Sequence, residues 1–374
     1  MISHTAKHLP PAMSIAIRPR LQNAYRPLVH FSRTQPSSTS AVTATAKAHD
    51  GGNTGGGEHK VLDPEFVNAP LSTLPAVLEL PQKAPGDSTF PHLIRTGKAY
   101  LGFYKTGLKN VYKNFIATRP IQGRIDKKGS ITDLVEAGEI TRREFQLVMR
   151  NRHDSRRIPI FGLMFMIFGE LSPFVLPFVS GIVPFNCRIP RQIHGDRTKL
   201  EERRAASFRN LPKGRDLLEL AQEKRSVQDL TSNEVLHCST VLGLHSAKWP
   251  SVLYPFLPPT MWLRFKLWRR LMYLDLDDIL LARGGGPGVL DSGEELKMAA
   301  VDRGFNTIQK TETRLREELK LWLKAKETAG GMTPALWLTR PTEWRNSSSP
   351  SSSSPPFSPT ALPSQRTPTS GKPQ

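Results

Sequence analysis

Glu170 is the first residue whose type and setting suggest chemistry, because it is the only charged side chain in the 28 residues from 158 to 185. This stretch holds 18 large apolar side chains, and a transmembrane helix needs about 20 apolar residues. A carboxylate inside a membrane costs about 2.5–3.5 kcal/mol, so it is expected to face protein, water or a proton pathway. Four prolines, among them Pro173, disturb a regular helix here. We predict a single transmembrane segment at 158–185 with Glu170 and Pro173 as functional candidates; a buried soluble helix pair broken at Ser172 is the alternative.

The other reactive side chains form no catalytic constellation in the sequence. His237 and Cys238 are adjacent, but neighbours on a helix point about 100° apart and do not readily share a metal ion. The aspartates in 275–278 are followed by Ile and Leu rather than by the ligands and glycine of an EF-hand. The glycine-rich segment 284–288 lacks the Lys-Ser/Thr that follows in a P-loop. We therefore predict no enzyme activity, no metal site and no cofactor.

The two ends of the chain have the composition of targeting and disordered segments. No Asp or Glu precedes Asp50, whereas arginines and hydroxyl residues are frequent, which is typical of a mitochondrial transit peptide. We assign residues 1–40 to a transit peptide, with a merely disordered basic tail as the alternative. Residues 41–90 are rich in Gly and Pro and predict a disordered linker. Residues 329–374 are assigned to a disordered Ser/Pro-rich tail.

The charge balance favours polyanionic partners. The chain has 52 basic and 33 acidic residues, a net charge of +19, and it stays strongly basic without residues 1–40. Lys and Arg neutralise phosphates and release counterions, so RNA, a ribosome surface and anionic lipid are all compatible with this charge. Only two cysteines are present, too few for a disulfide framework, which is compatible with the reducing mitochondrial matrix.

Aromatic and lysine residues alternate at helical spacing in residues 91–157, ahead of the apolar stretch. Tyr100, Tyr104, Leu108 and Tyr112 lie four residues apart, and lysines stand between them. The pattern predicts basic amphipathic, membrane-proximal helices that lie along a membrane surface. An ordinary helix that packs on a neighbour, with its lysines in solvent, explains the pattern equally well.

The remainder of the chain predicts an all-α fold, because no segment alternates with period two for long. Thr231 and Glu234 form the pattern of a capping box, as do Ser292 and Glu295, and Gly304 follows as a helix stop. A long helix is predicted at 260–281 with leucines on one face and Phe265, Trp268 and Met272 on a second, and a last helix at about 312–324.

Several of these segments, in order along the chain, resemble one known family. They are Thr141-Arg142-Arg143-Glu144, Ile158-Pro159, the apolar stretch with Glu170 and Pro173, Ile189-Pro190, Leu230-Thr231, Trp262-Leu263-Arg264-Phe265-Lys266-Leu267, Asp277-Asp278, Glu294-Glu295-Leu296, Arg303-Gly304 and Leu315-Arg316-Glu317-Glu318-Leu319-Lys320-Leu321-Trp322-Leu323. Together they resemble the Letm-type ribosome-binding domain family of the mitochondrial inner membrane, as a short member without EF-hand or coiled coil.

The resemblance implies a single-pass inner-membrane protein with its C-terminal domain in the matrix. Residues 186–328 would form the ribosome-binding domain, 14-3-3-like and ending in a SAP-like helix pair. The implied partners are the mitochondrial ribosome, through rRNA or ribosomal proteins, inner-membrane lipids and further copies of the chain. The contact candidates for the ribosome are the basic residues Arg264, Lys266, Arg269, Arg303, Arg314, Arg316 and Lys320.

Three functions are compatible with these expectations. The first is a membrane-tethered ribosome receptor that supports membrane insertion or translation of mitochondrially encoded proteins. The second is exchange of potassium or calcium for protons, with Glu170 as the titrating carboxylate in an assembly of several copies. The third is a matrix nucleic-acid-binding module that uses Arg314 and Arg316.

Overall fold

The structure is a computed structural model that describes residues 64–83, 88–168, 181–211, 225–245, 259–291 and 293–339. Every regular element in these ranges is a helix, which confirms the all-α fold class. The predicted transit peptide lies outside the described residues, as do Glu170, Pro173 and Ser292.

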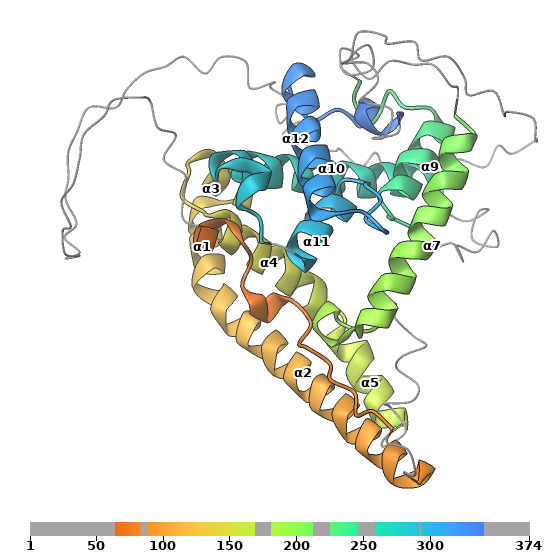
Figure 1. The fold of residues 1–374 in the computed structure, drawn as a ribbon. Coiled ribbons are helices and arrows are strands. Elements are labelled where there is room, and N and C mark those ends of the chain that lie inside the picture. Colours follow the sequence, from red (N-terminus) through yellow and green to blue (C-terminus); the bar gives the residue numbers. More distant parts are fainter. Residues whose placement is uncertain are drawn as a thin grey trace, which may run out of the picture.

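The N-terminal helices form one side of the molecule. Helix α2 (Thr89–Lys128) has 40 residues and is about 60 Å long at 1.5 Å per residue. A short helix, α3 (Ile131–Glu136), leads to α4 (Arg142–Ser155), which packs along the C-terminal half of α2. The α4 start is stabilised by a capping box between Thr141 and Glu144. Figure 1 shows α2 running diagonally along the lower side of the molecule, with its N-terminal end beside α5 (Ile158–Phe168) and far from α9 (Ser232–Val241), α10 (Pro259–Arg283) and α12 (Glu312–Thr328).

The C-terminal helices form the body of the molecule. They are α7 (Pro190–Arg209), α9 (Ser232–Val241), α10 (Pro259–Arg283), α11 (Glu294–Asp302) and α12 (Glu312–Thr328). The expected capping box of Thr231 and Glu234 is present, and Gly304 has a φ of 90° directly after α11, as expected for a helix stop. The largest core cluster joins α9, α10, α11 and α12 around Trp322, which is fully buried.

The sequence places α10 correctly but only one of its two apolar faces is buried. Leu267 and Leu274 are fully buried in the core, whereas Phe265 on the second face is 55% exposed. The second half of α10 also reaches the cluster between α2, α3 and α4 through Leu276 and Leu280. Helix α10 therefore connects the two parts of the fold.

The second half of the predicted linker is packed against the body, so the linker prediction is wrong there. Helix α1 (Pro64–Val67) and the 3₁₀ turn η2 (Leu71–Thr73) occupy part of 64–83. Val67 is 1% exposed and lies so close to Gly284 that a Cβ on this glycine would come within 2.6 Å of it. Asn68 donates to the carbonyl of Val289 at 2.9 Å. The glycine-rich segment thus receives α1, a contact between distant segments that composition does not reveal.

The predicted disordered tail at 329–374 also begins too early, because its first residues pack against the folded body. Residues 333–339 are buried, and they include the 3₁₀ helix η8 (Pro334–Trp337). Trp337 is 2% exposed, contacts Trp322 with ring centroids 5.0 Å apart, and donates to the carbonyl of Arg303. A tryptophan with this burial stabilises the core and belongs to the folded body.

The described residues do not support the single transmembrane segment predicted at 158–185. Of this stretch the structure describes helix α5 (Ile158–Phe168) and residues 181–185. Val183 is fully buried beside Phe161 in a cluster with α2. Among the described helices none is long and apolar enough to cross a bilayer.

Candidate functional site

Two features of the described residues are candidates for function: a buried ionic network and an exposed apolar arm. The network lies where α4, α10, α11 and α12 meet. Arg142 donates from Nε to Oδ1 of Asp277 at 2.8 Å and from Nη1 to Glu295 at 3.1 Å. It also donates to the carbonyl of Val67, so α1 is attached to the same network.

Arg303 forms the second half of the network. Its Nη2 donates to Oδ2 of Asp277 at 2.8 Å, and its Nε donates to Oδ1 of Asp278 at 2.8 Å. The indole of Trp322 donates to the other oxygen of Asp278. Asp277 thereby joins an arginine of α4 to the arginine that follows α11.

The charges in this network are balanced by close partners. Burial alone would raise the pKa of Asp277, but Arg142 and Arg303 outweigh it and hold the pKa below its usual value. Burial opposes the charge of Arg303, yet Asp278 and Asp277 raise its pKa. A group that is charged, paired and about 1% exposed is not offered to a ligand. We assign the network a structural role: it connects four helices and fixes their register.

Glu295, one half of the predicted capping box at α11, has its carboxylate engaged elsewhere, while its partner Ser292 lies outside the described residues. The helix begins at Glu294 after Gly293, which makes no side-chain capping hydrogen bond. Glu295 is 3% exposed and accepts from Arg142 and from Arg150, the latter at 2.6 Å. The Glu295 carboxylate forms ion pairs with two arginines of α4, and these arginines compensate the cost of burying its charge.

The apolar arm consists of α5 and residues 89–116 of α2. In Figure 1 these helices project from the body, and α5 lies beside the N-terminal half of α2. Tyr104 and Phe161 join the two helices, with ring centroids 6.3 Å apart. Their contact belongs to a small core that also holds Phe103, Val183 and Cys187. Beyond this core, the arm exposes apolar side chains.

The exposure of apolar side chains is concentrated on the arm. It carries 13 of the 20 exposed large apolar side chains among the described residues. They are Phe90, Leu93, Ile94, Leu101, Leu108, Tyr112, Phe115, Ile116, Ile160, Leu163, Met166, Ile167 and Phe168. Monomeric soluble proteins rarely expose large contiguous apolar patches, so this surface indicates an interaction site.

Cations stand beside the apolar residues of the arm. Arg95, Lys98, Lys105, Lys109 and Lys113 are all exposed on α2. The packed alternative for this helix holds on one face, where Phe103, Tyr104 and Val111 are buried, while Leu108, Tyr112 and Phe115 on the other face are exposed. Helical spacing revealed the amphipathic pattern, but it did not show which apolar residues lacked a partner.

Most of the predicted ribosome contacts serve the protein interior. Arg303 is fully buried, and Arg264 donates to the carbonyls of Val227, Gln228 and Leu230. Arg314 pairs with Glu318, and Arg316 donates to the carbonyls of Pro287 and Gly288.

Three further candidates lie closer to solvent. Lys266 lies over the ring of Trp262 and donates to the carbonyl of Leu244. Arg269 and Lys320 are exposed. Glu170 and Pro173 are not among the described residues.

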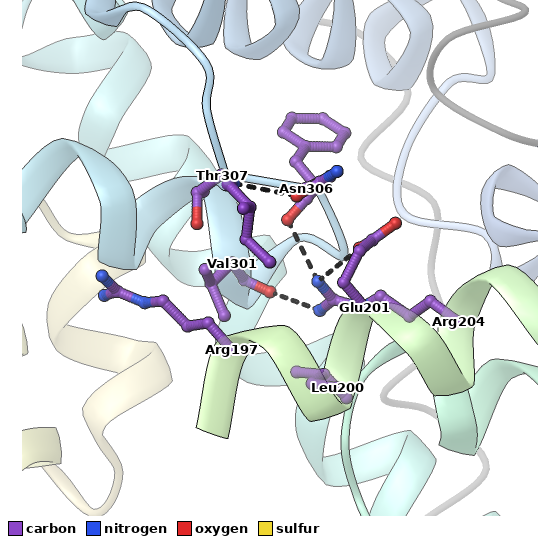
Figure 2. A pocket seen from close by; sticks show the side chains of 9 residues that line it. Arg197, Leu200, Glu201, Arg204, Val301, Asn306 and Thr307 are labelled. Carbon is purple, nitrogen blue, oxygen red and sulfur yellow. Dashed lines mark hydrogen bonds and ion pairs between the residues drawn. The ribbon is translucent and has the colours of Figure 1, made fainter. Parts of the chain in front are cut away.

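A hollow lies between α7 and the loop after α11 (Figure 2). It leaves no room for a water-sized group, so it is not a ligand pocket. Arg204 donates to the carbonyls of Val241, Phe305 and Val301 beside it. Burial lowers the pKa of Arg204 to about 10, and its role is to attach α7 to the body. No cluster of three metal-ligating side chains occurs in the described ranges.

Comparison with known proteins gives one match. The family model of the pentamidine resistance factor domain matches residues 89–284, more than half of the 374 residues, and includes the arm, α4, α7, α9 and α10. No curated protein and no solved structure matches the chain.

This match corrects the family assignment. It is to a different family from the Letm-type ribosome-binding domain, so that assignment is wrong. The 14-3-3-like and SAP-like descriptions of the body rested on the resemblance and are withdrawn with it.

Proposed function

Because the chain belongs to the pentamidine resistance factor domain family and exposes an apolar arm, we propose that it is a non-catalytic adaptor at the surface of the mitochondrial inner membrane. The arm inserts into the lipid interface on the matrix side. The basic body holds a mitochondrial ribosome near the membrane and supports insertion or translation of mitochondrially encoded proteins. The observation that carries the proposal is the concentration of exposed apolar side chains on α2 and α5.

The exposed apolar side chains of α5 suit the membrane interface. Interfacial helices bury an apolar face about 5–10 Å deep in the headgroup region. Met166 is 82% exposed and Ile167 is 64% exposed. Full burial of such a side chain contributes about 1.5–3 kcal/mol, so several of them together provide firm attachment.

The cations of α2 favour an anionic lipid surface. Each Lys or Arg near such a surface contributes about 1 kcal/mol, and this contribution is screened by salt. Arg95, Lys98 and Lys105 lie on the same helix as Phe90, Leu93 and Ile94. Apolar insertion and charge attraction therefore act at the same end of the molecule.

The ribosome part of the proposal is supported by composition. A net charge of +19 favours association with an RNA-rich particle through counterion release. The N-terminal composition favours import into mitochondria. Ion exchange has no support among the described residues, since Glu170 lies outside them. Nucleic-acid binding by Arg314 and Arg316 is not favoured, since both side chains hold the body together.

Flotation with lipid vesicles tests the membrane part. The full chain is mixed with phosphatidylcholine vesicles that contain about one fifth cardiolipin, which supply the anionic surface that attracts juxtamembrane cations. The wild type is expected to float, and Met166→Asp with Ile167→Asp is expected to reduce the floated fraction at least about tenfold, since two exposed apolar anchors become charged. Met261→Asp is the matched control, because Met261 is 67% exposed on the body. A wild type that stays at the bottom, or an arm variant that floats like the wild type, contradicts the proposal.

Co-sedimentation tests the ribosome part separately. The full chain is expected to sediment with purified mitochondrial ribosomes at about 50 mM salt and to dissociate at about 300 mM, because phosphate contacts are lost as salt rises. Absence from the ribosome pellet at the lower salt removes this part of the proposal and leaves the flotation result unaffected.

A further inference from the structure

The N-terminal half of α10 exposes the aromatic side chain of Phe265, beside Trp262 and Trp268, which are partly buried against the core cluster. One side of this helix is buried through Leu263 and Leu267. On another side, Phe265 is 55% exposed and Met261 is 67% exposed. In Figure 1, α10 lies in the body and well away from the free end of the arm, so this surface is separate from the proposed membrane contact.

The aromatic rings on this surface form a stacked platform, defined by Phe265, Trp268 and Arg269. The rings of Phe265 and Trp268 are stacked, with centroids 6.1 Å apart and an interplanar angle of 27°. The guanidinium carbon of Arg269 lies 5.8 Å from the centroid of the Phe265 ring. The platform therefore combines a flat apolar face with an exposed cation one helical turn away.

Neighbouring side chains keep the surrounding surface basic. Lys266 Nζ lies 3.3 Å from the centroid of the Trp262 ring, and burial lowers its pKa. Arg264, one residue before Phe265, is held against the loop at 227–230 by three carbonyls. These contacts position the side chains that flank Phe265, and the Phe265 side chain itself stays 55% exposed.

From this arrangement we infer that the platform binds single-stranded nucleic acid, with a base stacked on Phe265 and the backbone phosphate beside it paired with Arg269. Base stacking on an aromatic ring next to an arginine is how proteins hold single strands without reading sequence. Bases in a duplex are already stacked on each other, so their faces are not available to the ring.

The inference deepens the proposed function, on which it rests for the partner, because it names single-stranded RNA as the part of the ribosome that the body holds. A protein partner would also cover an exposed phenylalanine. However, the stacked rings and adjacent cations complement a base and a phosphate, and the net charge of +19 favours the polyanion.

Fluorescence anisotropy of the full chain with a labelled oligouridylate of about twelve nucleotides tests the inference, since sites of this kind cover about 4–16 nucleotides. Phe265→Ala is expected to weaken binding about tenfold, and Phe265→Trp is expected to retain it. Arg269→Ala is expected to reduce the steepness of the plot of log affinity against log salt concentration by about 1, which corresponds to the loss of one phosphate contact. A duplex of the same length is expected to bind more weakly and to be insensitive to Phe265→Ala.

Matched controls separate the platform from general effects. Phe115→Ala changes an aromatic side chain that is 43% exposed on the arm, and Arg191→Ala removes an exposed cation of α7. Both are expected to bind like the wild type. Circular dichroism and thermal unfolding establish that each variant is folded, and the Phe265→Trp variant keeps the test valid if Phe265→Ala is destabilised.

Two results would overturn the inference. One is equal affinity of the wild type and Phe265→Ala for the single strand, which would leave charge alone as the cause of binding. The other is no binding of the single strand at low salt while the chain still sediments with ribosomes. The second result leaves the proposed function in place and assigns the ribosome contact to protein.

Discussion

Arg142 and Asp277 lie 135 positions apart in the sequence and form a buried ion pair, with Nε of Arg142 2.8 Å from Oδ1 of Asp277 and both side chains 1% exposed. Asp277 also accepts from Gln146 at 2.7 Å and from Arg303 at 2.8 Å. The pair joins α4, inside the N-terminal layer, to α10, the central helix of the body. The relative position of the two parts of the fold therefore depends on this compensated charge cluster together with the apolar contacts of Leu276 and Leu280.

Removal of one partner of this pair is expected to destabilise the protein strongly. Arg142→Met leaves the carboxylates of Asp277 and Glu295 with fewer compensating charges, at a cost of about 3–5 kcal/mol in the free energy of unfolding. Urea unfolding followed by circular dichroism measures the loss. Arg143→Met is the matched control, because its contact with Glu65 is 3.8 Å long and exposed and is worth about 0–1 kcal/mol. Equal losses for both variants would show that the buried network does not connect the helices.

Gly107 is expected to tolerate no side chain. It lies in α2 against η5 (Phe185–Cys187), where a Cβ would come within 2.7 Å of the carbonyl oxygen of Asn186 and of the sulfur of Cys187. Gly107→Ala is expected to lower the free energy of unfolding by about 1–3 kcal/mol through overpacking, despite the higher helix propensity of alanine.

Gly102 offers the control on the same helix, since nothing lies within 4 Å of its added Cβ. Gly102→Ala is expected to stabilise the protein by up to about 1 kcal/mol. Thermal unfolding of the two variants should therefore shift in opposite directions, and a shift in the same direction would contradict the close packing of α2 against η5.

His245 is expected to make stability depend on pH below neutrality. Burial, with the nearby charges of Arg203 and Lys266, lowers its pKa from 6.5 to about 4. Ser239 Oγ lies 2.7 Å from Nδ1 of His245. The unfolded chain binds a proton near pH 6.5 and the folded chain does not, so stability is complete above about pH 6.5 and falls as the pH approaches 4.

Unfolding in urea between about pH 7 and pH 5 measures this dependence, because it covers the range in which only the unfolded histidine is protonated. His245→Gln is expected to flatten the curve, with a residual slope from His237, whose pKa is also lowered by burial. His194→Gln changes an exposed histidine of α7 and is expected to leave the curve unchanged. An unaltered slope in the His245 variant would refute the assignment.

Local signals in the sequence predicted helix ends well where the deciding contacts are local. Thr231 and Glu234 bond each other's backbone N–H groups, and Gly304 adopts a positive φ that other residues disfavour. Both signals depend only on neighbouring residues. Ser292 and Glu295 present the same pattern, but Glu295 pairs with Arg142 and Arg150. The pattern is identical in both places, and only a distant partner distinguishes them.

The candidate site was predictable in type but not in position. Net charge and helical spacing predicted cations beside apolar residues on α2, which the structure contains. The list of contacting arginines was less successful, since Arg303 is fully buried and Arg264 donates to three carbonyls. The sequence does not show whether an arginine or lysine side chain faces solvent or compensates a buried carboxylate. Short motifs such as Glu294-Glu295-Leu296 and Arg303-Gly304 misled the family assignment because amphipathic helices of many folds share them.

The sequence by itself determined that the protein is all-α, strongly basic and rich in apolar residues before Cys187, because composition and helical periodicity are properties of short segments. Only the tertiary structure decided which apolar and charged side chains are buried. Met166 and Phe161 are both apolar residues of α5, yet one is 82% exposed on the arm and the other is 1% exposed against Tyr104. Burial depends on what lies opposite each side chain in space, and here those partners come from helices that are far apart in the chain.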